Sequence, residues 1–205
     1  VRRAGGTLAL SAGMRPKPLL SVALPRPVGV ESRQEFCQIA LSEPPPADFV
    51  SRLAAALPEG VAVTGMVPWR KRKSVAAYVV GCRYMLHTQP STGRAAEGVE
   101  AVQTHGGERW GDMLAAAARR YTEAGSIMVE RRRPGEIRRV DVKLFVSQVQ
   151  VREDGGVEFH SLVGPGGSAR PQEIAAALAQ MAGEKIEVRS VERLAIDLGG
   201  DGLHG

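Results

Sequence analysis

Apolar and polar residues alternate along the chain from Ala76 to Leu86. Every second residue there is apolar, which is typical of a strand with one buried face; these residues are Ala76, Tyr78, Val80, Cys82, Tyr84 and Leu86. Trp110–Ala124 instead has apolar residues at the three-and-four spacing of a helix, and Gly125 follows as its cap. The intervening segment, 87–109, shows no period and is predicted to be a long mobile loop.

Three strands and a second helix are predicted after residue 125. They are the strands Val140–Val151, Val157–Val163 and Lys185–Asp197 and a helix from Pro171 to Gly183. The apolar phase changes face near Ser147, which predicts a bulge or bend there. Asp154-Gly155-Gly156 is a strong hairpin-turn sequence. The order strand, helix, strand, strand, helix, strand over 74–197 predicts a complete ferredoxin-like (βαββαβ) half.

The first 67 residues carry shorter elements of the same kinds. The predicted elements are strands over Thr7–Leu10, Leu19–Leu24, Gln34–Leu41 and Val61–Val67 and a helix with an apolar stripe from Phe49 to Leu57. We interpret 1–67 as a ferredoxin-like half that lacks its N-terminal strand and most of its first helix, which leaves a sheet edge exposed. The fold class is therefore α+β, with two such halves, a basic linker over 68–73 and a disordered tail over 198–205.

Composition indicates a folded protein with a cytoplasmic location. Apolar residues make up 43% of the 205 residues, which is enough for a core. No apolar run approaches the roughly 20 residues of a membrane helix. The two cysteines, Cys37 and Cys82, lack the spacing of a metal site, so no metal or cofactor is expected. The formal net charge of +5 favours an anionic partner such as RNA.

Basic residues gather in several short clusters at loops and strand ends. They are Arg15, Lys17, Arg26, Arg70, Lys71, Arg72, Lys73, Arg131, Arg132, Arg133, Arg138, Arg139 and Lys143. Phosphate binding needs converging positive charge, and arginine offers planar donors that match phosphate oxygens. We predict that these clusters form one RNA-binding face; the alternative is an ordinary solvated surface.

The stretch Gly13–Ser32 combines four prolines with two glycines around a short apolar run. Pro16, Pro18, Pro25 and Pro27 each fix their own φ and favour an extended preceding residue. Gly13 and Gly29 can adopt backbone angles that other residues rarely take. The stretch is therefore predicted to be a strand between two rigid loops.

This stretch also resembles the radical SAM-linked protein family, a domain of unknown function found beside or fused to radical SAM enzymes. The resemblance rests on Ser11-Ala12-Gly13, the two prolines at 16 and 18, Ser21-Val22-Ala23-Leu24-Pro25 and Pro27-Val28-Gly29-Val30-Glu31-Ser32, and more loosely on 56–60 and 140–143. Family members usually have an aromatic residue and Asn at Met14 and Arg15, and Arg-Pro at 143–144. The cluster motif CxxxCxxC is absent here, so the resemblance implies a separate radical SAM enzyme as partner.

The remaining candidate groups have no clear catalytic pattern. His87, His105, His160 and His204 have no recognisable partner in the sequence, and Asp141 is expected to orient an arginine or to mark a site. The glycine-rich segment 164–168 precedes a predicted helix. It is either a flexible connection between a strand and that helix or a loop that binds a phosphate group. Tyr78 and Tyr84 share the apolar face of their strand, so Trp69 is the better candidate for an exposed aromatic residue.

These features predict a non-catalytic, RNA-binding accessory module for a separate radical SAM enzyme. One alternative is an enzyme that processes or modifies RNA, with His160 or His87 beside Asp141 in a cleft. Another is a protein-interaction module whose exposed sheet edge pairs with its partner.

Overall fold

A computed structural model describes residues 1–90 and 106–200 of the chain. The fold is α+β, as predicted. The chain forms two compact units: unit 1 comprises Val1–Pro25, Glu35–Tyr78 and the described part of Leu198–Gly205, and unit 2 comprises Arg26–Gln34 and Val79–Asp197. The predicted division at a basic linker over 68–73 stays a prediction, and most of the predicted loop (91–105) and tail (201–205) lies outside the described residues.

Unit 1 is built from short elements. They are the 3-10 helices Arg2–Ala4 (η1) and Val75–Tyr78 (η2), the strands Leu20–Val22 (β1) and Cys37–Ile39 (β3), and the helix Phe49–Ala55 (α1). β1 and β3 pair antiparallel, and α1 confirms the helix predicted at Phe49. The predicted strand Val61–Val67 is wrong, since these residues form no helix or strand. Its residues suit a strand, but strand residues are stabilised by cross-strand partners, and none pairs with them in the described chain.

The proline-rich stretch passes from unit 1 into unit 2 after Pro25. Gly13 and Gly29 have φ of 124° and 80°, so both positions favour glycine as the sequence predicts. β1 lies between them, which agrees with a strand flanked by two constrained loops. A second short strand, Val30–Ser32 (β2), follows Gly29.

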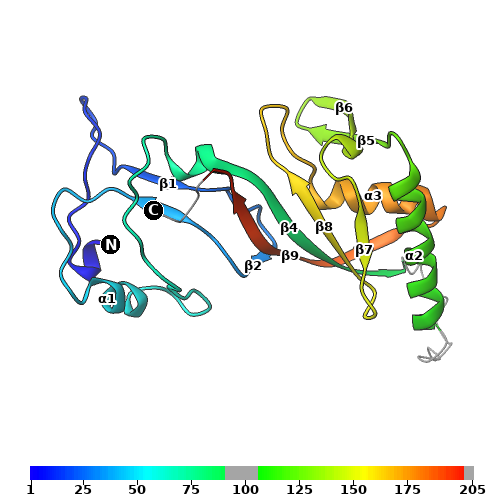
Figure 1. Cartoon of the computed structure of the whole chain (residues 1–205), viewed down its shortest axis with the longest axis horizontal. Coiled ribbons are helices and arrows are strands. Elements are labelled where there is room, and N and C mark those ends of the chain that lie inside the picture. Colours follow the sequence, from blue (N-terminus) through cyan, green and yellow to red (C-terminus); the bar gives the residue numbers. More distant parts are fainter. Residues whose placement is uncertain (91–105, 201–205) are drawn as a thin grey trace. The chain divides into compact units, whose positions relative to one another are not determined.

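Unit 2 is organised around a five-stranded sheet (Figure 1). Its strands are β2, Val79–Pro90 (β4), Val149–Val151 (β7), Gly156–Leu162 (β8) and Ile186–Leu198 (β9), in the spatial order β2-β9-β4-β8-β7. β8 pairs antiparallel with β4 and β7, and β2 runs parallel to β9. The helices Gly106–Glu123 (α2) and Pro171–Ala182 (α3) confirm the two predicted helices, and Pro171 starts the second as expected.

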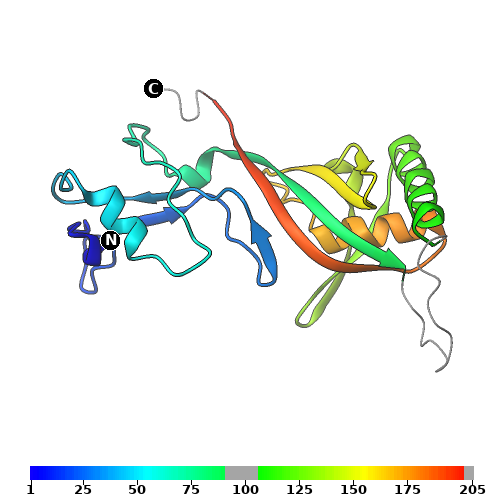
Figure 2. The same ribbon diagram turned by 90° about the horizontal axis from the view of Figure 1, so that it is seen from below.

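The two helices of unit 2 cover one face of its sheet (Figures 1 and 2). The core on that face is mainly apolar and includes the fully buried Leu86, Leu114, Val157, Ile174 and Leu178; Arg193 on β9 is also fully buried and donates to the Tyr84 hydroxyl. The alternate residues of β4 and β8, such as Arg83 and His160, are exposed on the opposite face. The sequence pattern places Val80 on the buried face of β4, but Val80 is 46% exposed and its neighbour Val79 is buried. The predicted alternation is therefore wrong at the start of this strand. Unit 2 therefore has one apolar and one polar sheet face.

The chain between α2 and β7 departs most from prediction. The expected single strand Val140–Val151 is instead the end of Glu136–Asp141 (β6), the 3-10 helix Val142–Leu144 (η3), a loop and β7. β6 pairs with Met128–Arg133 (β5) in a separate two-stranded sheet. Gly135, with φ of 77°, permits the turn between them, and the Asp141 carboxylate ends the strand by capping η3. The apolar phase change marks this break, and Ser147 lies at a bend of the loop before β7, so the bend alternative of the prediction is confirmed.

In the described part of the chain, no helix is both long and apolar enough to cross a membrane.

Candidate nucleic-acid interface

The hairpin of β5 and β6 carries the densest positive charge in unit 2. We call residues 128–141 the arginine ribbon. Five arginines lie between residues 131 and 139; they are Arg131, Arg132, Arg133, Arg138 and Arg139. In the hairpin register Arg131 faces Arg138 and Glu130 faces Arg139. Figure 2 shows the turn of the ribbon projecting beyond α3.

Arg131 anchors the ribbon to α3 and is itself buried. It is 5% exposed, and its guanidinium donates to both carboxylate oxygens of Glu173, with Nε–Oε1 2.6 Å and Nη2–Oε2 2.7 Å. Nη2 also donates to the Ser168 carbonyl at 2.8 Å, and the hydrogen bond to Glu173 raises the pKa of Arg131. This side chain is therefore enclosed by protein and engaged through Nε and Nη2, so it is not one of the exposed cations of the ribbon, and its predicted contact with RNA stays a prediction.

The other four arginines of the ribbon are exposed. Alternation along the strands places Arg133 and Arg138 on the same face as Arg131, and Arg132 and Arg139 on the other. Arg132 pairs with Glu130 at 3.1 Å, at a site where the Arg132 side chain is 76% exposed. Among the described residues no ion pair or hydrogen bond holds the other three side chains. The ribbon therefore presents free guanidinium groups on both faces.

Lys143 has a structural role that differs from its predicted one. Its Nζ donates to the carbonyls of Tyr121 (3.1 Å), Thr122 (3.3 Å) and Ser147 (2.5 Å) and lies 4.9 Å from the centre of the Tyr121 ring. Two of these carbonyls belong to the last turn of α2, where a cation is favoured. Lys143 thus caps a helix and ties down the loop at Ser147, and its predicted contact with RNA stays a prediction.

Asp141 orients backbone groups and not an arginine. Its Oδ1 accepts from the N–H groups of Ile127 (2.9 Å) and Lys143 (3.1 Å). Burial alone would raise the pKa of Asp141, but these hydrogen bonds and one from Ser126 outweigh it, so its pKa lies below the ordinary value. The carboxylate therefore fixes the base of the ribbon where β6 ends.

The stability of unit 2 should fall in acid partly through Asp141. A folded-state pKa below the unfolded one contributes stability that is present above the unfolded pKa and lost as pH falls through the folded pKa. Asp141→Asn keeps an acceptor oxygen and removes the titration. We expect urea denaturation of this variant between about pH 7 and pH 3 to show a shallower acid-side decline than wild type. The control is Glu136→Gln, a change at an exposed residue of the ribbon, which should lose stability in acid as steeply as wild type. If the Asp141→Asn and Glu136→Gln variants lose stability with the same slope, Asp141 does not have this role.

The other predicted basic residues lie outside the ribbon. Arg15, Lys17, Arg70, Lys71, Arg72 and Lys73 belong to unit 1, and Arg26 to unit 2. The prediction that all clusters converge on one face stays a prediction. Trp69 is half-buried: its Nε1 donates to the Lys73 carbonyl at 2.9 Å and its ring packs edge-on against Tyr78. Trp69 is therefore partly exposed, like Tyr78 and unlike the buried Tyr84.

The aromatic side chains of the main sheet face the helices. Tyr84 and Phe159 are buried and stack at 5.5 Å between ring centres, and burial raises the pKa of Tyr84 to about 12. This confirms Tyr84 as a core residue. The loop at Gly164–Ser168 is also structural, since Gly164 and Gly167 bond each other and Ser168 accepts from Arg131.

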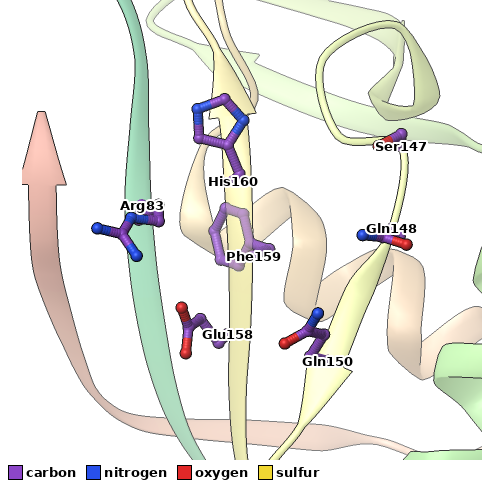
Figure 3. A pocket seen from close by; sticks show the side chains of 7 residues that line it. All are labelled: Arg83, Ser147, Gln148, Gln150, Glu158, Phe159 and His160. Atoms are coloured by element: carbon purple, nitrogen blue, oxygen red, sulfur yellow. The ribbon is translucent and has the colours of Figure 1, made fainter. Parts of the chain in front are cut away.

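The exposed face of the main sheet holds a second polar cluster (Figure 3). His160 on β8 pairs with Asp197 on β9, Nε2–Oδ2 2.7 Å, and not with Asp141 as the enzyme alternative expects. Gly81 lies beneath this pair: a Cβ there would come within 2.4 Å of His160 Nε2. A cleft of about 240 Å³ beside the histidine is lined by Arg83, Ser147, Gln148, Gln150, Glu158, Phe159 and His160.

Sequence reasoning missed Gly81, Arg83 and Asp197. One signal was present, since an isolated glycine inside an alternating strand often marks a close approach of another group. Of the other histidines, His87 lies on β4, and His105 and His204 lie outside the described residues. Within 1–90 and 106–200, no group of three histidine, cysteine or acidic side chains could hold a metal ion.

A family model described as "Uncharacterized protein conserved in bacteria (DUF2344)" matches residues 1–173. A search of curated proteins found no match.

Proposed function

The chain belongs to the DUF2344 family of uncharacterised bacterial proteins, and we propose that it is a non-catalytic, RNA-binding accessory module. The observation that carries the proposal is the arginine ribbon. Four exposed arginines lie on a two-stranded arm, and a buried ion pair holds that arm to α3.

A rigid arm of this kind suits the phosphate backbone of RNA. Guanidinium groups bind phosphate oxygens through two parallel hydrogen bonds, and their positive charge displaces counterions from the nucleic acid. Because Arg131 anchors the middle of the ribbon to α3, little backbone entropy is lost on binding, and the entropic cost is confined to the exposed arginine side chains. The main sheet, with Tyr84 and Phe159 turned to the core, offers no aromatic platform for base stacking there. We therefore expect binding with little base preference.

The proposal has two further parts. The partner is a separate radical SAM enzyme, as the resemblance of the Gly13–Ser32 stretch implies. The second part is that the scaffold of unit 2 is ferredoxin-like. The spatial strand order β9-β4-β8-β7 and the placement of α2 and α3 on one face of the sheet support it.

A second candidate is an enzyme that processes or modifies RNA. The paired His160 and Asp197 beside an open cleft favour it, because a carboxylate that orients an imidazole is a common acid–base arrangement.

Removing the charge of the ribbon should weaken RNA binding and its salt dependence. In a variant with Arg132, Arg133, Arg138 and Arg139 all changed to Gln, the slope of log affinity against log salt should fall by up to about 3, at about 0.7 per phosphate contact. Fluorescence anisotropy with a labelled single-stranded RNA at several NaCl concentrations measures this slope.

The matched control removes two exposed arginines of unit 2 that lie outside the ribbon, Arg119→Gln with Arg189→Gln. The slope of log affinity against log salt should stay close to that of wild type in this control, with only a small decrease from the lower net charge of the protein. RNA binding by wild type that is insensitive to salt, or equal slopes in wild type and the ribbon variant, would refute the proposal. Turnover of RNA by purified protein that is lost in His160→Ala would favour the enzyme candidate instead.

A further inference from the structure

The cleft on the exposed face of the main sheet joins side chains from three strands. Arg83 on β4 and His160 on β8 are direct partners in the antiparallel register, so their side chains leave the same face side by side. Gln150 on β7 faces Glu158, the neighbour of His160 on that face of β8. In Figure 3 Arg83 lies on the β4 side of β8, and Gln148 and Gln150 lie on its β7 side. Polar groups from three strands therefore line the cleft on both sides of β8.

The acidic groups of the cleft already have partners. Asp197 pairs with His160, and two of the three side-chain nitrogens of Arg152, Nε and Nη2, donate to Glu158. By contrast, no ion pair or hydrogen bond of the described chain engages the guanidinium of Arg83 or the amides of Gln148 and Gln150. The cleft therefore has an excess of free hydrogen-bond donors and one uncompensated positive charge.

The His160 ring is held in a fixed orientation. Asp197 binds Nε2, and the missing Cβ of Gly81 leaves the space that the ring needs. In Figure 3 the other ring nitrogen points to the side of Ser147 and Gln148. The Lys143 ammonium in turn fixes the Ser147 carbonyl. The walls of the cleft are therefore ordered before any ligand enters.

We propose that this cleft is a phosphoryl-binding site, in which Arg83, the second N–H of a doubly protonated His160 and the two glutamine amides donate to the oxygens of a phosphate monoester. Donors from three strands match a tetrahedral oxyanion better than a planar carboxylate, and a guanidinium is the usual partner of phosphate. An open cleft of about 240 Å³ has room for a phosphate and for part of the molecule that carries it. The site does not rest on the arginine ribbon and goes beyond the RNA-binding function.

The test is a titration of the whole chain, labelled with 15N, with inorganic phosphate in chloride buffer, followed through the imidazole resonances of His160 and His87. We expect a saturable shift of His160 with a dissociation constant of about 1 mM or tighter. Arg83→Gln should weaken the response at least about tenfold, the loss of one charged hydrogen-bonding partner. The matched control Arg189→Gln, an exposed arginine of β9, should respond like wild type.

Further probes separate the source of the phosphate. Adenosine monophosphate should shift His160 and adenosine should not; a response to RNA with a 5′-phosphate, absent without it, assigns the group to an RNA end. The ribbon variant should keep the response to phosphate, so failure of RNA binding and failure of this site are distinguishable. The proposal is overturned if no phosphate probe gives a saturable shift of His160, or if Arg83→Gln responds like wild type.

Discussion

Glu173→Gln is expected to destabilise unit 2 by about 3–5 kcal/mol. Glu173 and Arg131 are each 5% exposed and form a bidentate ion pair between α3 and β5. Removing the carboxylate charge leaves a buried guanidinium without its counter-charge, which is the costly case for a buried pair. Because small domains are stable by only about 5–15 kcal/mol, this single change takes a large share of the total. Urea denaturation followed by circular dichroism measures the loss.

Two variants test whether the buried charge is the cause. Glu130→Gln breaks the exposed pair with Arg132 and should cost at most about 1 kcal/mol. The double variant Arg131→Met with Glu173→Gln removes both charges and should recover part of the loss, since an uncharged replacement is often tolerated. A loss below about 1 kcal/mol in Glu173→Gln, or no recovery in the double variant, would contradict this account.

The long periodic elements of unit 2 could be predicted because local pattern and tertiary environment agree there. Trp110–Ala124 has an apolar stripe that α2 buries against the sheet and α3, and Pro171 and Gly183 mark the two ends of α3. The strand Val61–Val67 could not be excluded from the sequence, because its residues suit a strand and only the lack of a partner prevents one. Strand pairing is a non-local property that a single segment does not encode.

The candidate sites were less predictable, for the same physical reason. Arg131 and Arg132 are adjacent in the sequence, yet one is buried on Glu173 and the other is exposed. Their roles depend on which face of the ribbon meets α3. Likewise, His160 and Asp197 come from different strands and meet across Gly81. Which side chains from separate elements meet depends on how those elements pack. The spacing of residues in the sequence does not show this packing.

Gly81→Ala should destabilise unit 2 by about 1–3 kcal/mol, although alanine is intrinsically better than glycine in a strand. The added Cβ would lie 2.4 Å from His160 Nε2 and 3.2 Å from Asp197 Oδ2, so the imidazole must leave its place above the strand. The hydrogen bond between His160 and Asp197 should be lost with it. Denaturation gives the change in stability, and the His160 imidazole resonances report the change in the ring's surroundings.

The matched glycine variant is Gly111→Ala on α2. A Cβ at Gly111 meets nothing within 4 Å and the residue lies inside a helix, so this variant should be more stable than wild type by about 0.5–1 kcal/mol. Combining Gly81→Ala with His160→Ala removes the ring that the new methyl group meets and should restore most of the stability. If Gly81→Ala is as stable as wild type, or if the loss persists without the imidazole, Gly81 is not the residue that makes room for the His160–Asp197 pair.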